Sequence, residues 1–77
     1  MNRNEWLLDF STNLRLMMRK NRITQIELAD KAKISRRTVN RYINCEQVPS
    51  AIAIANMSKV LNCDIGDLIW LDDLIEE

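Results

Sequence analysis

The chain has 77 residues, 47% of them hydrophobic, with 11 basic and 11 acidic side chains and no histidine. A single domain of this size buries only about 60% of its unfolded surface, so we expect modest stability that dimerisation would raise. Because Gly and Pro occur only once each, the composition favours an all-α chain with short connections. No apolar run approaches the roughly 18 residues that a membrane span requires.

The residues offer little catalytic chemistry. The sequence has no His, no Gly-rich phosphate-binding loop and no Cys/His cluster, and the paired acids at 72–73 and 76–77 are typical of solvated charges. We therefore expect no enzymatic activity, no cofactor and no metal site. Cys45 and Cys63 form no disulfide framework, and no signal-peptide pattern precedes them, which favours a reduced cytoplasmic setting.

The basic and acidic residues are distributed unevenly. Residues 1–41 contain ten of the eleven Lys and Arg residues and four acids, whereas residues 42–77 contain Lys59 and seven acids. A local basic field is what attraction to phosphate requires, although charge runs are also usual on solvated helix faces. We favour nucleic-acid binding because three of the arginines concentrate on one predicted helix.

The first predicted helix covers about residues 4–20. Its apolar side chains recur at steps of three and four, which predicts a stripe facing the core: Trp6, Leu7, Phe10, Leu14, Met17 and Met18. The basic residues at 19–22 end this helix, where positive charge complements the helix dipole.

Two short helices follow, with a tight turn between them. Thr24 and Glu27 have the spacing of a capping box, which predicts a helix from Gln25. Ser35 is a favourable N-cap for a second helix through about Ile43. One arc of this second helix carries only basic and amide side chains: Arg36, Arg37, Asn40, Arg41 and Asn44. The remaining side can pack inward, and the pair of helices suits insertion into a DNA major groove.

The last part of the sequence predicts two more helices and a terminal segment. Ser50 is placed to cap a fourth helix over about 51–61, which is almost uncharged and should lie across the core. Asp64 is placed to cap a short fifth helix. The segment 70–77 then combines acids with four large apolar residues, which either fold back on the core or are buried against a partner: Trp70, Leu71, Leu74 and Ile75. We favour burial in a homodimer.

Three stretches carry a resemblance to a known family: Thr24-Gln25-x-Glu27-Leu28-Ala29, Ile34-Ser35-x-x-Thr38-Val39-x-Arg41-Tyr42 and Pro49-Ser50. Over about residues 14–69 the chain resembles the Cro/phage-repressor type of helix-turn-helix proteins. The resemblance implies a lambda-repressor-like fold, a compact bundle of five short helices in a single domain, 1–77. Its second and third helices would form the helix-turn-helix, at about 25–44.

The resemblance also implies which residues read bases. Arg36, Arg37 and Arg41 match the family's base-reading positions, and Asn40 lies beside them. Arg can bind guanine O6 and N7 and Asn can bind adenine N6 and N7, each such pair giving about 1–3 kcal/mol of discrimination. The alternative is that one or two of these side chains only grip phosphates.

A second group of residues is expected to contact the DNA backbone: Gln25, Thr24, Ser35, Thr38, Asn44, Lys20 and Arg22. The resemblance supplies this role for Gln25, which in the family also reaches an outer base in some cases, and for Asn44. Thr24 and Ser35 would cap their helices first and contact phosphate second. Lys20 and Arg22 would equally complement the end of the first helix.

The sequence departs from the family where relatives often carry Gly, at Arg22, Lys33 and Cys45. Gly serves a positive φ at a helix end, so we expect Asn21 or Asn44 to supply that conformation one residue earlier. The helix ends near these residues are therefore left open.

Together these features predict a sequence-specific, double-stranded DNA-binding transcriptional regulator. It would be a small phage- or plasmid-type repressor that binds a palindromic operator as a dimer, with half-sites about one helical turn apart. The alternative is a protein-interaction module on the same fold, such as an antitoxin or a regulator of another repressor, because fold alone does not settle function. The segment 70–77 is the feature that would serve such a protein partner.

Overall fold

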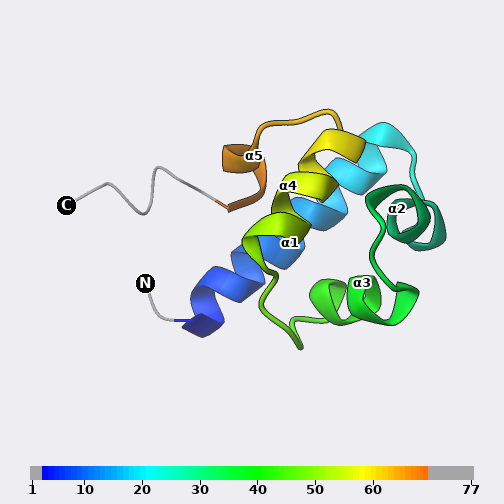
Figure 1. The fold of residues 1–77 in the computed structure, drawn as a ribbon. Helices are drawn as coiled ribbons and strands as arrows, with labels where there is room; N and C mark the ends of the chain where they lie inside the picture. The colour runs from blue at the N-terminus through cyan, green and yellow to red at the C-terminus, as the bar shows by residue number, and fades with distance from the viewer. Residues whose placement is uncertain (1–2, 70–77) are drawn as a thin grey trace.

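The computed structural model describes residues 3–69, which fold into a bundle of helices (Figure 1). These are α1 (Arg3–Asn21), α2 (Gln25–Ala32), α3 (Arg36–Ile43), α4 (Ala51–Val60) and α5 (Ile65–Ile69). The predicted all-α fold is confirmed, with α1 longer than the others at 19 residues. No helix within residues 3–69 is long and apolar enough to cross a membrane. Four residues predicted at a dimer or partner interface lie outside the described residues: Trp70, Leu71, Leu74 and Ile75.

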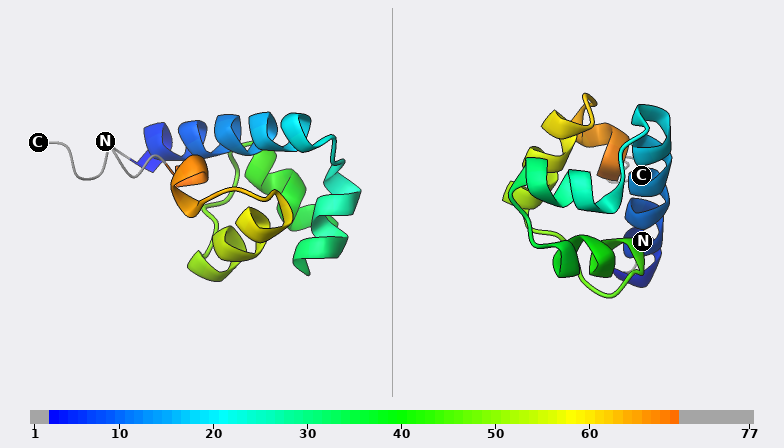
Figure 2. Two further views of the ribbon diagram at one scale, coloured as in Figure 1. Left: turned by 90° about the horizontal axis from the view of Figure 1, so that it is seen from above. Right: turned by 90° about the vertical axis from the view of Figure 1, so that its right-hand side faces the viewer.

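α1 lies along one edge of the bundle, and the other helices all lie on the same side of it (Figure 2, left). α3 and α5 pack directly on α1, α2 packs on α3 and α4, and α4 packs on α5. One face of α1 is therefore directed away from the bundle. α2 and α3 lie next to each other, as a helix-turn-helix requires (Figure 1).

The apolar stripe predicted on α1 forms one wall of the core. Trp6 stacks on Phe10 with the ring centroids 5.6 Å apart, and Phe10 meets Tyr42 of α3 edge to face at 6.0 Å. Not every apolar side chain of α2 and α4 is buried, because Ile26 and Ile52 are 51% and 74% exposed. The core is built from these buried apolar side chains: Leu7, Phe10, Leu14, Met18, Leu28, Ala29, Ala32, Val39, Tyr42, Ala53, Ile54, Met57, Leu61 and Leu68.

Two polar side chains of α1 are buried in this core and connect it to other helices. The Ser11 hydroxyl donates a hydrogen bond to the backbone carbonyl of Tyr42, at the end of α3. The Asn13 amide donates to the backbone carbonyl of Leu68 in α5, at 3.2 Å. Because both side chains are buried and hydrogen-bonded, they fix the position of α1 relative to α3 and α5 without leaving an unpaired polar group.

Side-chain caps begin α2, α3 and α4 as predicted. The Glu27 backbone N–H donates to the Thr24 hydroxyl at 3.1 Å, and the Thr24 N–H donates to the Glu27 carboxylate at 2.9 Å, which completes the capping box. Ser35 and Ser50 each accept the backbone N–H three residues further on, at 3.0 and 3.1 Å. These caps fix where each helix begins.

Each of the first four helices is followed by a residue with positive φ: Arg22 (54°), Lys33 (61°), Cys45 (61°) and Asn62 (53°). The next backbone N–H then returns to a carbonyl five residues earlier, as from Ile34 to Ala29 at 3.0 Å. This is the Schellman arrangement that satisfies the last carbonyls of a helix.

The prediction that Asn21 or Asn44 would supply the positive φ is wrong. Asn44 has a φ of −91°, and Asn21 is the last residue of α1. The Asn21 amide instead donates to the backbone carbonyl of Leu61 at 2.9 Å, which ties the end of α1 to the end of α4. After α1, α2 and α3, the left-handed residue is therefore the one at which relatives often carry Gly.

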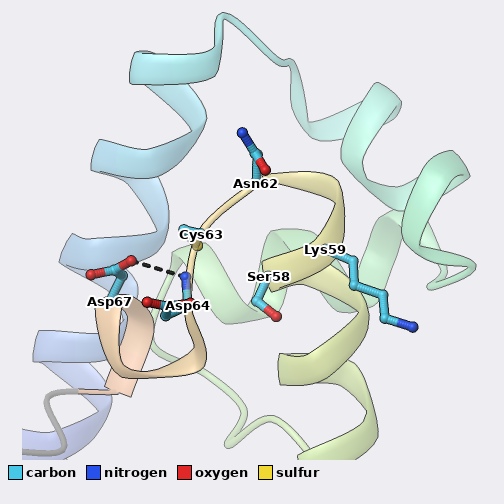
Figure 3. A pocket seen from close by; sticks show the side chains of 6 residues that line it. All are labelled: Ser58, Lys59, Asn62, Cys63, Asp64 and Asp67. Atoms are coloured by element: carbon cyan, nitrogen blue, oxygen red, sulfur yellow. Dashed lines mark hydrogen bonds between the residues drawn. The ribbon is translucent and has the colours of Figure 1, made fainter.

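The turn from α4 into α5 is held by acids. The backbone N–H of Asp64 donates to the carboxylate of Asp67 at 2.9 Å (Figure 3). Sequence reasoning placed Asp64 as the capping side chain, whereas the bond found here runs from the Asp64 backbone to the side chain three residues on. α5 therefore begins with one of the two hydrogen bonds of a capping box, the one from the N-cap backbone N–H to the side chain three residues on.

Candidate nucleic-acid interface

α3 separates its side chains into a buried face and an outer face. Val39 is fully buried and Tyr42 is 3% exposed, so these two residues anchor the helix on α1 and α2. Anchoring there turns the predicted arc outward, where four of its members are exposed and one is partly buried: Arg36, Arg37, Asn40 and Asn44, with Arg41 the partly buried one. The outer face of α3 therefore carries three arginines and two amides.

A row of three amides connects the start of α2 to the end of α3. The Asn44 amide nitrogen donates to the Asn40 side-chain oxygen at 3.1 Å. The Asn40 amide nitrogen in turn donates to the Gln25 side-chain oxygen, at 3.4 Å. Asn40, expected as a base reader, thus lies between the two residues expected at phosphate. The row ends at the side-chain oxygen of Gln25, at the start of α2.

Arg36 also has a partner that sequence reasoning missed. Its guanidinium Nη2 lies 3.6 Å from the Asp30 carboxylate on α2, and the two side chains are 64% and 63% exposed. An exposed ion pair of this kind contributes about 0–1 kcal/mol. Arg36 can therefore leave Asp30 for another anion at little cost. No sequence pattern indicates this pair, because its members lie on different helices.

The three hydroxyl residues expected at the DNA backbone are engaged in helix caps. The Ser35 hydroxyl donates to the Thr38 hydroxyl at 2.8 Å while it accepts the Thr38 backbone N–H. Hydrogen bonds from the Thr24 backbone N–H, and then from the Thr24 side chain, lower the pKa of Glu27 below its ordinary 4.5. Both capping residues remain exposed, so capping does not prevent a further contact.

The basic corner between α1 and α2 is also exposed. Lys20 is in the last turn of α1, and Arg22 follows that helix in the left-handed conformation. The corner leads directly into Thr24 and Gln25, at the start of α2. It thus supplies positive charge next to the α2 end of the amide row.

A short chain of hydrogen bonds connects the buried side of α3 to α1. The Cys45 thiol donates to the Ser11 hydroxyl at 3.2 Å, and that hydroxyl donates to the carbonyl of Tyr42. This chain holds the C-terminal end of α3 on α1 from the buried side. The apolar pattern gives no indication of it, since Ser11 resembles a surface residue in the sequence.

A hollow of about 430 Å³ lies away from α3, at the junction of α4 and α5 (Figure 3). Its lining includes Cys63, Asp64 and Asp67, and the Lys59 side chain extends away from the two acids. Burial, followed by the charges of Asp67 and Asp64, raises the pKa of the Cys63 thiol. Within residues 3–69 there is no cluster of three His, Cys, Asp or Glu side chains that could hold a metal ion.

Comparison with known proteins gives one match. A family model described as the Cro/C1-type HTH DNA-binding domain matches residues 13–73, which include all of α2, α3, α4 and α5. No curated protein and no solved structure matches the chain. The matched range makes up most of the sequence, and the family is one of DNA-binding regulators rather than enzymes. The chain therefore belongs to the family of Cro/C1-type helix-turn-helix DNA-binding domains.

Proposed function

We propose that this DNA-binding regulator is a transcriptional repressor that binds a palindromic operator as a dimer and blocks a promoter by occupying it. The observation that carries the proposal is the outer face of α3, where three arginines and two amides lie opposite the buried Val39 and Tyr42. A helix with this division can enter the major groove while its other side stays in the core. The reducing cytoplasm is the setting in which we place it.

Base reading is assigned to the outer face of α3. Arg36 and Arg37 occupy its first turn, the part of the helix that enters the groove in this motif, and Arg41 and Asn40 follow one turn on. The arginines would each bind a guanine through O6 and N7. Asn40 would bind adenine, or it would hold Gln25 and Asn44 in place through the amide row.

Phosphate contacts are assigned to the residues around this face: Gln25, Thr24, Ser35, Thr38, Asn44, Lys20 and Arg22. Gln25 and Asn44 stand at the two ends of the amide row, and their separation would set the register of α3 along the groove. The basic corner at Lys20 and Arg22 would add charge to one side of the contact. Such contacts set position and affinity, and they carry no sequence information.

The test is selection of bound duplexes from a randomised DNA library at near-physiological salt. Enrichment of a palindrome with half-sites about one turn apart would support the proposal. Arg36→Ala, Arg37→Ala and Arg41→Ala should then each cost about 1–3 kcal/mol and relax the preference at one base position. Lys59→Ala is the matched control, since it removes a basic side chain from α4, and it should leave the selected sequence unchanged.

Two other results would overturn the proposal. Binding that is steeply salt-dependent without enrichment of any sequence would mean that the arginines only grip phosphates. Absence of binding to any duplex would favour the protein-interaction module, in which the segment 70–77 would bind a protein partner.

A further inference from the structure

α1 carries an apolar surface that the bundle does not cover. Leu8 and Leu16 are 55% and 51% exposed, and at about 100° per residue they lie on one side of α1 with Thr12 between them. Arg15 and Arg19 lie next to Leu16 on this side of the helix, and a hollow of about 250 Å³ is lined by Thr12, Arg15, Leu16 and Arg19. These five residues are referred to below as the outer face of α1. The other helices lie on the opposite side (Figure 2).

The chain contains one segment whose chemistry matches this face. In 70–77 the apolar residues fall into two pairs, each at a step of four, and acids fill the remaining positions. If the segment formed a helix on docking, at about 100° per residue its apolar residues would occupy one arc and its acids the opposite arc. The apolar arc would cover Leu8 and Leu16, and the acids at the edges of that arc would lie beside Arg15 and Arg19. Apolar surface and opposite charge are thus both complementary.

We propose that the outer face of α1 is the docking surface for the segment 70–77 of a second copy of this chain. In a two-fold dimer each copy would place its segment on the other, so that both faces are covered. The proposal rests on the dimer of the proposed function and names the surfaces that would form it.

Chain length favours a second copy over the same copy. α5 ends against another side of α1, where Asn13 donates to the Leu68 carbonyl at 3.2 Å, and Asn13 lies about 140° around the helix from Leu8. Passing that far around a helix about 10–12 Å across takes about four extended residues. If the segment docked on its own copy, residues 70–73 would be used to reach the face. Only residues 74–77 would then remain to cover Leu8 and Leu16, which lie about 12 Å apart along the axis of α1. A partner's segment need not pass around this helix, so more of its eight residues can lie along that distance.

The first experiment measures the dimer dissociation constant of the full chain by sedimentation. Leu16→Glu should raise this constant about 10- to 100-fold, because it replaces a docked apolar side chain with a charge. Ile52→Glu is the matched control, since it makes the same change at a more exposed residue of α4, and it should have no effect. Thr12→Glu provides a second variant on the same face, and circular dichroism checks that each variant is folded.

The second experiment separates exchange between copies from folding back within one copy. Leu16→Glu disables the face and Leu74→Glu disables the segment, so each variant alone should dimerise about 10- to 100-fold more weakly than the wild-type chain. In a mixture, one intact face meets one intact segment, and a heterodimer should form with about half of the wild-type contacts. If the segment docks on its own copy, mixing restores nothing, and the proposal is overturned.

Its failure is distinguishable from failure of the proposed function. The same variants are tested for binding to a duplex with a single half-site, which needs only α3. A dimer that is unaffected by Leu16→Glu, or a wild-type chain that stays monomeric, would overturn the docking proposal whether or not DNA binds. Loss of dimerisation with retained half-site binding is the expected result.

Discussion

The ion pair between Asp30 and Arg36 allows a quantitative test of the proposal that Arg36 contacts a DNA base. If Arg36 reads a base, it must leave the Asp30 carboxylate, and Asp30→Asn removes the need to do so. At the 3.6 Å found here, the attraction in water is about 1 kcal/mol, which is also the upper end for exposed pairs. Asp30→Asn should therefore tighten binding to the selected operator by up to about fivefold.

The assay is fluorescence anisotropy with a labelled operator duplex at constant salt. Asp64→Asn is the control, since it removes the same charge from the turn before α5 and should change the affinity little. In an Arg36→Ala background the gain from Asp30→Asn should disappear, apart from any general effect of lowering the negative charge. If Asp30→Asn instead weakens binding, Asp30 orients Arg36 for the base and does not compete with it, and the reasoning above is refuted.

Three further predictions concern stability. Lys33→Gly should stabilise the fold by about 0.5–1 kcal/mol, because Lys33 adopts the left-handed conformation, which is unfavourable for a residue with a Cβ atom and favourable for Gly. A rise of a few degrees in the unfolding temperature would show this. Because the folded pKa of Glu27 is lowered, its contribution is present above about pH 4.5 and lost as pH falls through the folded pKa, so Glu27→Gln should flatten the acid side of a stability–pH curve. Ser11→Ala should cost about 1–2 kcal/mol in urea unfolding, because it removes the buried bond to the Tyr42 carbonyl; an unchanged midpoint would contradict this.

The features that the sequence predicts well are determined locally. The capping box of Thr24 and Glu27 and the cap at Ser35 depend on residues three apart, so their spacing is readable before any tertiary structure exists. The outer arc of α3 follows in the same way from the period of a helix. For this reason the positions of α2 and α3, and the exposure of Arg36 and Arg37, could be predicted.

The features that the sequence does not predict depend on contacts between helices. Asp30 meets Arg36 only because α2 and α3 pack against each other. The amide of Asn21 is used by α4, so this residue does not adopt the left-handed conformation expected of it. Ser11 resembles a surface residue by type, yet α3 covers it completely. Residue type and periodicity carry no information on these arrangements.

The contacts that stabilise α3 and the residues proposed to read DNA are largely separate. The start of α3 is held by the exposed Ser35 cap, and its end is held from the buried side by the Ser11 bond to the Tyr42 carbonyl. Side chains on its outer face bond to one another, to Gln25 and to Asp30, and all of them except the partly buried Arg41 are exposed. Substitutions there remove little buried surface, so they should change which DNA is bound far more than whether the chain folds. If the outer face of α3 reads DNA as proposed, such a scaffold would acquire a new operator by changing a few side chains on one helix face.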